Sequence, residues 1–422
     1  MRGQPSSASA TTGEPDDAGY DAGPDAGWAR RAADVLPGGA STGSKRVAAL
    51  YGADEPAGPT HYRSARGCRV VAADGRELVD FTMALGSVAL GYADPDVVRA
   101  ASRALAEGNV AGLSSTREVE LAERLCDVIP CGEAVRFLKT GAEGVAAAVR
   151  IARAATGRDH VVACGYFGWL DWATDAPGVP AAARADVSVM PFDDVAALER
   201  AVDAAGPRLA AIVLEPVQER LPSPGWVRRA RELCDRAGAV LILDEVKTGF
   251  RLRAGGWQAL AGVRPHVAVF AKALANGLPL AAVVGQRGVM DAARRSWISS
   301  TLASETVALA AAGAVLDRHA REDVCAVIEQ VGERQRTIVR AALDEAGAGD
   351  AVTLAGIAPM WFLRWADAER ERRFVAAMVR RGVLVKRGAY HFPSPAHDDA
   401  AHDLLADALP DALRQALDGT LA

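Results

Sequence analysis

The segment "AAIVLEPVQERLPSPGWVRRARELCDRAGAVLILDE", residues 210–245, decides the fold of this chain. It holds two apolar runs, "AAIVLE" (210–215) and "AVLILDE" (239–245), with the helical pattern "WVRRARELCDRAG" (226–238) between them. Short runs with apolar residues on both faces are typical of buried strands in parallel sheets, whose connections are usually helices. The segment therefore predicts a strand–helix–strand unit of an α/β fold.

The same alternation extends to both sides of this segment. Further apolar runs occur at residues 134–139, 160–163, 267–271 and 281–285, and a helical pattern covers residues 143–157. We therefore expect one mostly parallel sheet with helices on both faces. Ligands of such sheets bind beyond the carboxyl ends of the strands, so we look for functional side chains there.

Differences in composition and sequence pattern divide the chain into four parts. Residues 1–26 contain no Val, Leu, Ile or Phe, so we expect a disordered tail. Residues 27–80, with an expected hairpin turn at residues 74–75, and residues 316–422, rich in charged helical patterns, are predicted to form one smaller α+β domain. Residues 81–315 between them make up the large domain.

Composition argues against several classes of function. The net charge is −5 and no run of Lys or Arg exceeds two residues, which argues against a nucleic-acid partner. The six cysteines are scattered without a C-x-x-C pair and the seven histidines are dispersed, so we expect reduced thiols in a cytoplasmic protein and no metal site. We find neither a signal peptide nor an apolar run of about 18 residues, so we expect no membrane partner.

The segment "KTGAEG", residues 139–144, links one of the predicted strands to a helix. The amides of Gly141, Ala142 and Glu143, together with the dipole of the helix, would form a seat for a phosphate. An ordinary glycine-containing turn is the alternative for this segment taken alone.

Two charged residues follow predicted strands. Asp244 ends the run at 239–245, where a buried carboxylate needs a partner: a metal, a helix end or a protonated ligand nitrogen. Lys272 follows the run at 267–271. Its amine either reaches solvent or lies in an apolar pocket, where a lowered pKa makes it a nucleophile for carbonyl groups.

Aromatic residues make up only 5% of the chain, yet "YFGWLDW" (166–172) places four of them just after the run at 160–163. Aromatic clusters usually belong to a core or an interface, but this one lies at the predicted ligand-binding edge. An aromatic cofactor with a phosphate, a basic ring nitrogen and an aldehyde would use the phosphate seat, the aspartate, the lysine and the rings. Pyridoxal phosphate has these groups.

From about Trp28 to the C-terminus, the chain resembles the class III, fold-type I pyridoxal-phosphate aminotransferases, closest to the glutamate-1-semialdehyde aminomutase branch. The motifs that carry this resemblance are "LPGGASTGSKR", "VRFLKTGAEGVAAAVRIARAATGRD", "YFGWLDW", "IVLEPV", "LILDEVKTGFR", "AKALANGLP" and "SSTLASETVALAAA". Each motif is weak alone, and together they are highly specific. The resemblance implies a large domain with a mostly parallel, seven-stranded sheet, and a homodimer with active sites at the subunit interface.

The resemblance also implies roles for individual residues. Lys272 would form the Schiff base with the cofactor and act as catalytic acid and base, and Asp244 would hold the protonated ring nitrogen. The remaining cofactor contacts that the resemblance implies are Tyr166 on one face of the ring, Val246 on the other, the amides of Gly141 and Ala142 at the phosphate, and Thr301 at the phosphate of the neighbouring subunit.

The chain departs from the family pattern at several positions. Ala142 lacks the hydroxyl that is usual at the phosphate seat, Phe167 replaces the usual histidine, and Lys247 adds a charge beside the cofactor. "SETVA" (304–308) replaces the Gly-Asn-Pro of the aminomutase and places Glu305 near the site entrance contributed by the partner subunit. These features resemble the sugar-directed members, which include transaminases that aminate an oxidised 6'-carbon of aminoglycoside antibiotics.

We therefore expect an aminotransferase that acts on an oxidised amino sugar, with Trp169 and Glu305 on the substrate side and Trp172 in the core. A pyridoxal-phosphate isomerase, either an aminomutase or an epimerase, needs the same residues and differs in working without an amino donor. A non-catalytic binding protein on the same fold is the remaining alternative, and the presence of both Lys272 and Asp244 argues against it.

Overall fold

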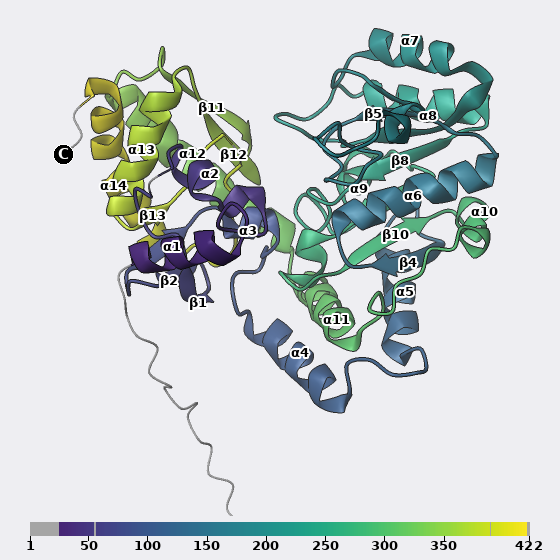
Figure 1. Cartoon of the computed structure of the whole chain (residues 1–422), viewed down its shortest axis with the longest axis horizontal. Helices are drawn as coiled ribbons and strands as arrows, with labels where there is room; N and C mark the ends of the chain where they lie inside the picture. Colours follow the sequence, from purple (N-terminus) through teal and green to yellow (C-terminus); the bar gives the residue numbers. More distant parts are fainter. Residues whose placement is uncertain (1–24, 55, 389, 420–422) are drawn as a thin grey trace, which may run out of the picture.

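The computed structural model describes residues 25–54, 56–388 and 390–419. The predicted tail, residues 1–26, lies outside these ranges except for Asp25 and Ala26 at the start of α1 (Asp25–Val35). Figure 1 shows two lobes, a larger one with the central sheet and a smaller one that holds both ends of the described chain. Within the described ranges, no helix has the length and apolar character needed to cross a membrane.

The large lobe is built on a seven-stranded sheet. Its strands, in spatial order, are β4 (Ala134–Leu138), β10 (Ala281–Gly285), β9 (Val267–Phe270), β8 (Val240–Asp244), β7 (Leu209–Leu214), β5 (His160–Cys164) and β6 (Val187–Val189). Neighbouring strands are parallel except at β10, which is antiparallel to both β4 and β9. The prediction of a mostly parallel, seven-stranded sheet is therefore confirmed. Six strands coincide with the apolar runs, whereas β6 is a three-residue edge strand, too short to give such a run.

Alternate residues of the strands enter two separate cores. In β8, Val240 and Ile242 pack on the side of α6 (Gly141–Thr156), whereas Leu241 and Leu243 pack on the side of α8 (Trp226–Ala237). The core on the side of α8 also contains residues of α5 (Thr116–Val128), α7 (Val195–Ala205) and α11 (Thr306–Arg321). Burial of each Val, Leu or Ile contributes about 1.5–3 kcal/mol, so both faces hold the strand ends in fixed positions.

The small lobe brings together segments from both ends of the chain. The antiparallel strands β1 (Tyr62–Arg66), β2 (Arg69–Ala72) and β3 (Glu77–Asp80) are joined by β13 (Val383–Leu384), which pairs in parallel with β3. The predicted hairpin turn connects β2 and β3, with Gly75 at a φ of 88°. The other elements of this lobe are β11 (Val352–Ile357), β12 (Met360–Trp365), α12 (Val324–Glu345), α13 (Ala368–Arg380) and α14 (Asp399–Asp418).

Helix ends follow the capping residues in the sequence. α4 (Pro95–Glu107) begins after Asp94, whose carboxylate accepts from the amides of Asp96 and Val97, each at 3.1 Å. The remaining short elements are η1 (Gly43–Lys45), α2 (Val47–Tyr51), α3 (Met83–Gly86), η2 (Ala181–Arg184), η3 (Gly206–Arg208), α9 (Trp257–Ala261), η4 (Lys272–Ala275), α10 (Arg287–Met290) and η5 (Asp291–Arg295).

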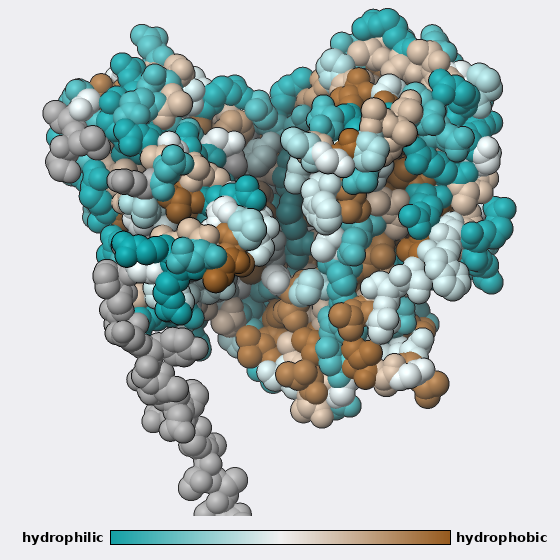
Figure 2. Space-filling view, viewed as in Figure 1, coloured by the Kyte–Doolittle hydropathy of each residue, from teal (hydrophilic) through white to brown (hydrophobic). Residues whose placement is uncertain are grey.

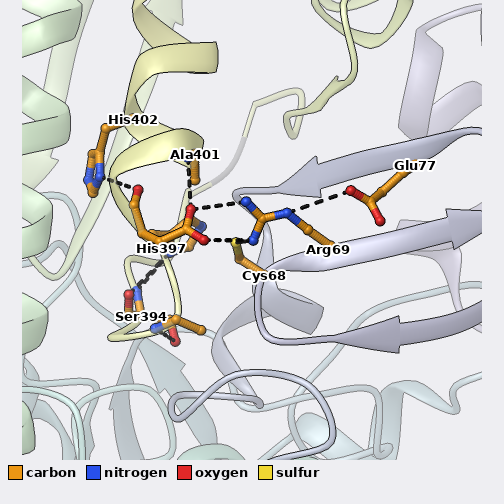
Figure 3. A network of polar contacts seen from close by, with 9 residues as sticks. Cys68, Arg69, Glu77, Ser394, His397, Ala401 and His402 are labelled. Carbon is orange, nitrogen blue, oxygen red and sulfur yellow. Dashed lines mark hydrogen bonds and ion pairs between the residues drawn. The ribbon is translucent and has the colours of Figure 1, made fainter.

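A polar network fastens the N-terminal strands to the last helix of the small lobe (Figure 3). Arg69 of β2 donates two hydrogen bonds, of 2.9 and 3.0 Å, to Asp398 at the start of α14. The neighbouring His397 accepts from the amide of Ser394 through Nδ1 at 3.1 Å, and its Nε2 lies 3.1 Å from the carbonyl oxygen of Asp80. Burial lowers the pKa of His397 to about 4, so the ring is neutral and donates to that carbonyl. The N-terminal strands and the start of α14 are thus joined beside Asp80, the last residue of β3.

Candidate active site

Side chains from four neighbouring strands meet at the carboxyl edge of the central sheet. Tyr166 follows β5, Glu215 follows β7, Asp244 ends β8 and Lys272 follows β9. All four line a cavity of about 390 Å³, here called the inner cavity. The predicted site residues in its wall are Gly141, Ala142, Tyr166, Trp169, Asp244, Val246 and Lys272.

The predicted phosphate seat is the first turn of α6. Thr140 caps this helix by accepting from the amide of Glu143 at 3.2 Å, and the Glu143 carboxylate accepts from the amide of Thr140 at 2.9 Å. The amide of Glu143 is therefore already used, which corrects the expectation that it contributes to the seat. Gly141 and Ala142, the first two residues of the helix, have amides without intrahelical partners and face an anion with the helix dipole behind them.

The wall of the seat tolerates no side chain at two glycines. A Cβ on Gly141 would lie 2.9 Å from Cγ1 of Val246, and a Cβ on Gly168 would lie 2.4 Å from the Cβ of Ala142. Gly168 also has a φ of 91°, in the left-handed region that favours glycine. These glycines keep the backbone amides open to the cavity, so the residues present fit a phosphate-bearing ligand.

Asp244 is buried at the base of the inner cavity. Its Oδ1 accepts from the amide of Val246 at 2.9 Å. Burial, and after it the nearby charge of Glu215, raise the pKa of Asp244 to about 7 against the opposing effects of that amide and of two lysines. A protonated ring nitrogen in the cavity would supply the cation that this buried carboxylate needs, so Asp244 also fits the expected cofactor.

Lys272 begins η4 with a φ of 49°, an uncommon value for a residue with a side chain. Such strain costs on the order of 1–3 kcal/mol and is concentrated at functional sites. Burial lowers the pKa of the Lys272 amine, as does the neighbouring Lys247 charge, whereas Asp244 opposes the shift. A larger fraction of the amine is therefore neutral near physiological pH, which is the form that attacks a carbonyl.

Lys247, the charged departure from the family pattern, is paired. Its Nζ lies 2.6 Å from Oε1 of Glu215 and 4.4 Å from the ring centre of Tyr390. The two charged side chains are only 10% and 13% exposed. The sequence analysis gave Glu215 no role. Glu215 follows β7 at the same sheet edge at which Asp244 ends β8, and this position was the signal that could have identified it.

A second cavity of about 590 Å³, here called the outer cavity, adjoins the first and shares Tyr166, Glu215, Lys247 and Lys272 with it. The other residues in its wall are Leu85, Cys164, Gly165, Met190, Phe192, Gln218, Glu219, Tyr390 and Phe392. Leu85, Tyr390 and Phe392 come from the segments around the small lobe, so both lobes build this cavity. Sequence reasoning missed these three because contacts between distant segments leave no local pattern.

Leu85 reaches the outer cavity from a left-handed turn. Met83, Ala84 and Leu85 have φ values of 42°, 49° and 56°, and Gly86 follows at 82°. Each left-handed residue with a side chain costs roughly 1–2 kcal/mol, so the turn must be held by its surroundings. The carboxylate of Asp80 accepts from the amide of Met83 at 3.3 Å and also bonds the residue before it. The turn therefore gives Leu85 a fixed position in the cavity wall.

The four rings of residues 166–172 divide into two pairs. Tyr166 and Trp169 are 77% and 74% exposed and face the inner cavity. Phe167 is buried and stacks with the half-buried Trp172 at a ring-centre distance of 5.7 Å. Trp172 thus packs in the core as expected, whereas Tyr166 and Trp169 are available to a ligand or a second subunit.

Glu305 does not line either cavity, and its carboxylate is engaged elsewhere. It caps α11 by accepting from the amide of Val307 at 2.9 Å and that of Ala308 at 3.1 Å, and its Oε1 lies 2.7 Å from Nζ of Lys139. A substrate ammonium would have to displace Lys139, so the structure argues against Glu305 as a substrate carboxylate. Thr301 lies four positions earlier, exposed and outside the walls of both cavities of its own subunit.

Comparison with known proteins agrees with this geometry. A family model described as aminotransferase class-III matches residues 51–393. The chain is similar to the 2'-deamino-2'-hydroxyneamine transaminase of Streptomyces kanamyceticus, with 38% identity over 352 residues, or 82% of this chain and 89% of that protein. It is also similar to the glutamate-1-semialdehyde 2,1-aminomutase of Anaeromyxobacter dehalogenans strain 2CP-C, with 35% identity over 68% of this chain and 70% of that one.

Solved structures agree with the fold. The FumI protein of Sphingopyxis sp. MTA144, in its pyridoxal-phosphate internal aldimine form, superimposes with a TM-score of 0.87 at 26% identity. The alignment covers 94% of this chain and 98% of that one, so it includes both lobes.

Proposed function

The chain belongs to the class-III aminotransferases and uses pyridoxal phosphate as its cofactor, and on that premise we propose that it transfers an amino group onto an oxidised amino sugar. The acceptor carbonyl would be the 6'-oxo group of an aminoglycoside or its precursor. The observation that carries this proposal is the composition of the outer cavity, which combines aromatic rings with carboxylates next to Lys272. Similarity to a transaminase named for a neamine substrate supports the same substrate class.

The outer cavity suits a sugar that bears ammonium groups. Tyr166, Phe192 and Tyr390 present rings, on which the apolar C–H faces of a sugar stack. Glu219 presents an exposed carboxylate whose pair with Arg364 a substrate ammonium can exchange, whereas Glu215 is already paired with Lys247. Among the described residues that line the two cavities there is no arginine, so neither wall is arranged around a fixed guanidinium for a substrate carboxylate.

Pyridoxal phosphate, when bound, supplies an aldehyde that takes up the amine and a ring that accepts an electron pair from the substrate carbon. Gly141 and Ala142 would bind its phosphate through their amides, and Tyr166 and Val246 would hold the ring. Asp244 would keep a proton on the ring nitrogen, because the buried carboxylate is stabilised by a cation beside it.

Lys272 performs the proton transfers. Its amine would hold the cofactor and, once free, would accept a proton from the substrate carbon. The lowered pKa of Lys272 favours the neutral amine that this step needs. The Lys247–Glu215 pair adds one charge of each sign beside this amine, so its net charge is zero.

We include a homodimer in the proposal, with Thr301 reaching the phosphate seat of the other subunit. Figure 2 shows apolar side chains gathered on the large lobe over α4 and α11. The exposed fractions are 63% for Leu105, 87% for Leu113, 88% for Trp297 and 53% for Leu302. Large exposed apolar patches mark interaction surfaces, and a second copy of the chain would cover this one.

An isomerase remains the second candidate, because the chain is also 35% identical to a glutamate-1-semialdehyde aminomutase. Such an enzyme would use the same Lys272 and Asp244 for an intramolecular reaction. The two activities differ in one requirement, since only the aminotransferase needs an amino donor.

Replacing Glu219 by glutamine tests the role of the outer cavity. Glu219 is exposed at the cavity wall and pairs with Arg364, a contact that a substrate ammonium can exchange. Exposed ion pairs contribute about 0.2–1 kcal/mol, so we expect Glu219→Gln to raise the KM of a polycationic acceptor up to about fivefold. Steady-state kinetics with an oxidised aminoglycoside measure this, and added salt should weaken acceptor binding more in the wild type.

Glu333→Gln is the matched control, because Glu333 is an exposed carboxylate on α12 that pairs with Arg336 and Arg340 and lines neither cavity. It should leave acceptor KM unchanged. An acceptor KM that Glu219→Gln does not alter, or a donor KM that rises equally, contradicts the assignment of the outer cavity to a cationic sugar.

A further inference from the structure

The Lys139–Glu305 ion pair joins three segments of the site. Lys139 follows β4 and directly precedes the phosphate seat. Its Nζ lies 2.7 Å from Oε1 of Glu305, the cap of α11, and donates to the carbonyl oxygen of Pro279 at 3.1 Å in the loop that follows Lys272. The two side chains are only 16% and 10% exposed. The pair therefore fixes α11 against both the phosphate seat and the lysine loop.

Glu305 also follows the loop of residues 296–304, in which Ile298 is buried and Thr301 is exposed. Its neighbour Thr306 donates through its amide to the carbonyl of Asn109 at 2.9 Å and through its hydroxyl to that of Gly108 at 3.1 Å. Thr301 lies within the loop and faces solvent in the single chain. The C-terminal end of the loop is thus held in place at Glu305 and Thr306, and Thr301 lies on the surface.

The partly desolvated Lys139–Glu305 pair holds the start of α11 in place. Removing one partner leaves the other charge without compensation in a site of low exposure, which costs more than losing an exposed pair. The side-chain contacts of Lys139 in the described chain run to Glu305 and Pro279, so its charge serves this ion pair. Movement of Glu305 would shift Thr301, which lies four residues away along a segment that is exposed at Leu302 and half-buried at Ala303 and Ser304.

We propose that the Lys139–Glu305 pair is a positioning device that couples the two cofactor sites of the homodimer. It holds the loop that carries Thr301 against the phosphate seat of its own subunit, while Thr301 serves the seat of the partner. This inference rests on the proposed homodimer and on the proposed role of Thr301. The pair acts through these groups and does not itself touch the reacting atoms.

Three variants separate the ion pair from the helix cap. Glu305→Asp keeps a favoured capping residue but is one methylene shorter, so it caps α11 without reaching Lys139. Glu305→Gln and Lys139→Met remove one charge each. We expect each variant to weaken cofactor binding about tenfold, which corresponds to ~1.4 kcal/mol, and the double variant Lys139→Met/Glu305→Gln to be no weaker than either single one.

Cofactor binding is measured by titrating the cofactor-free dimer with pyridoxal phosphate and following the visible absorbance of the lysine-bound cofactor. Lys139→Arg should retain nearly full affinity because it keeps the charge. Glu371→Gln is the matched control, since Glu371 pairs with Arg387 at 3.2 Å in the small lobe with comparably low exposure. Tighter cofactor binding in Glu305→Asp would overturn the proposal, because it would show that a released Lys139 binds the phosphate itself.

Mixed dimers decide whether the effect crosses the interface. One subunit carries Lys272→Ala, so that only the other, unmodified subunit gives the absorbance of lysine-bound cofactor. Adding Glu305→Asp to the Lys272→Ala subunit should weaken binding in the unmodified subunit by most of the tenfold effect. Unchanged affinity in that subunit would contradict the coupling.

A second mixed dimer, with Thr301→Ala added to the Lys272→Ala subunit, tests the premise separately. If Thr301→Ala weakens cofactor binding in the unmodified subunit and Glu305→Asp does not, only the proposed coupling fails. If it has no effect, the proposed role of Thr301 fails and the coupling fails with it.

Discussion

Replacing Lys272 by alanine is expected to lower turnover at least a thousandfold while the chain stays folded. Lys272 is the amine that emerges from β9 between the two cavities, with a pKa lowered by burial. In the proposed mechanism its loss removes both the nucleophile that holds the cofactor and the base that moves the substrate proton, and general acid–base catalysis alone contributes about 10²–10⁴-fold. We expect the circular dichroism and the oligomeric state to match the wild type.

Lys272→Ala should also abolish the visible absorbance of lysine-bound cofactor, which borohydride removes from the wild type by reduction. Turnover above about a thousandth of the wild-type rate would remove Lys272 from both roles. Lys247→Met is a useful comparison, because Lys247 lies in the same walls but is neutralised by Glu215. It should retain cofactor attachment.

Replacing Asp244 by asparagine is expected to lower turnover about a hundredfold. Burial raises the pKa of this carboxyl to about 7, so it is stabilised as an anion only beside a cation. A neutral amide cannot favour a proton on the ring nitrogen. Hydrogen bonds to charged groups contribute about 1.5–3 kcal/mol, and a hundredfold loss in rate corresponds to ~2.7 kcal/mol.

Glu245→Gln is the matched control for Asp244→Asn. The adjacent Glu245 is fully buried, and its carboxylate accepts from the amides of Trp257 at 2.8 Å and Gln258 at 2.9 Å. This variant should lower stability but not the turnover per bound cofactor. Near-normal turnover in Asp244→Asn, with cofactor bound, would show that the ring proton is maintained by another group.

The large sheet and the central pair of site residues were predictable for one physical reason. Strands buried on both faces give apolar runs that stand out in the sequence, and the carboxyl ends of parallel strands share one edge. Asp244 and Lys272 therefore had to meet once their strands were recognised. The start of α6 at Gly141 was predictable from the glycine-containing turn, and its role as a phosphate seat stays a prediction.

The substrate side was not predictable from local pattern. Tyr390 and Phe392 lie far from the sheet in sequence and reach the outer cavity only through the packing of the small lobe. Glu305 was expected on the substrate side because the family resemblance placed it near the site entrance contributed by the partner subunit, whereas its carboxylate pairs with Lys139 and caps α11. The left-handed turn at Leu85 gave no signal, because the three residues before its glycine are ordinary apolar ones.

The measurement that tests the proposed function most directly is the fate of nitrogen from a ¹⁵N-labelled amino donor. Wild-type enzyme is incubated with the donor and a 6'-oxo aminoglycoside, and the product is analysed by mass spectrometry. In parallel, glutamate-1-semialdehyde is supplied without any donor. We expect ¹⁵N in the aminated sugar and no turnover of glutamate-1-semialdehyde. Isomerisation of glutamate-1-semialdehyde without a donor, together with no label in the sugar, would contradict the proposed function.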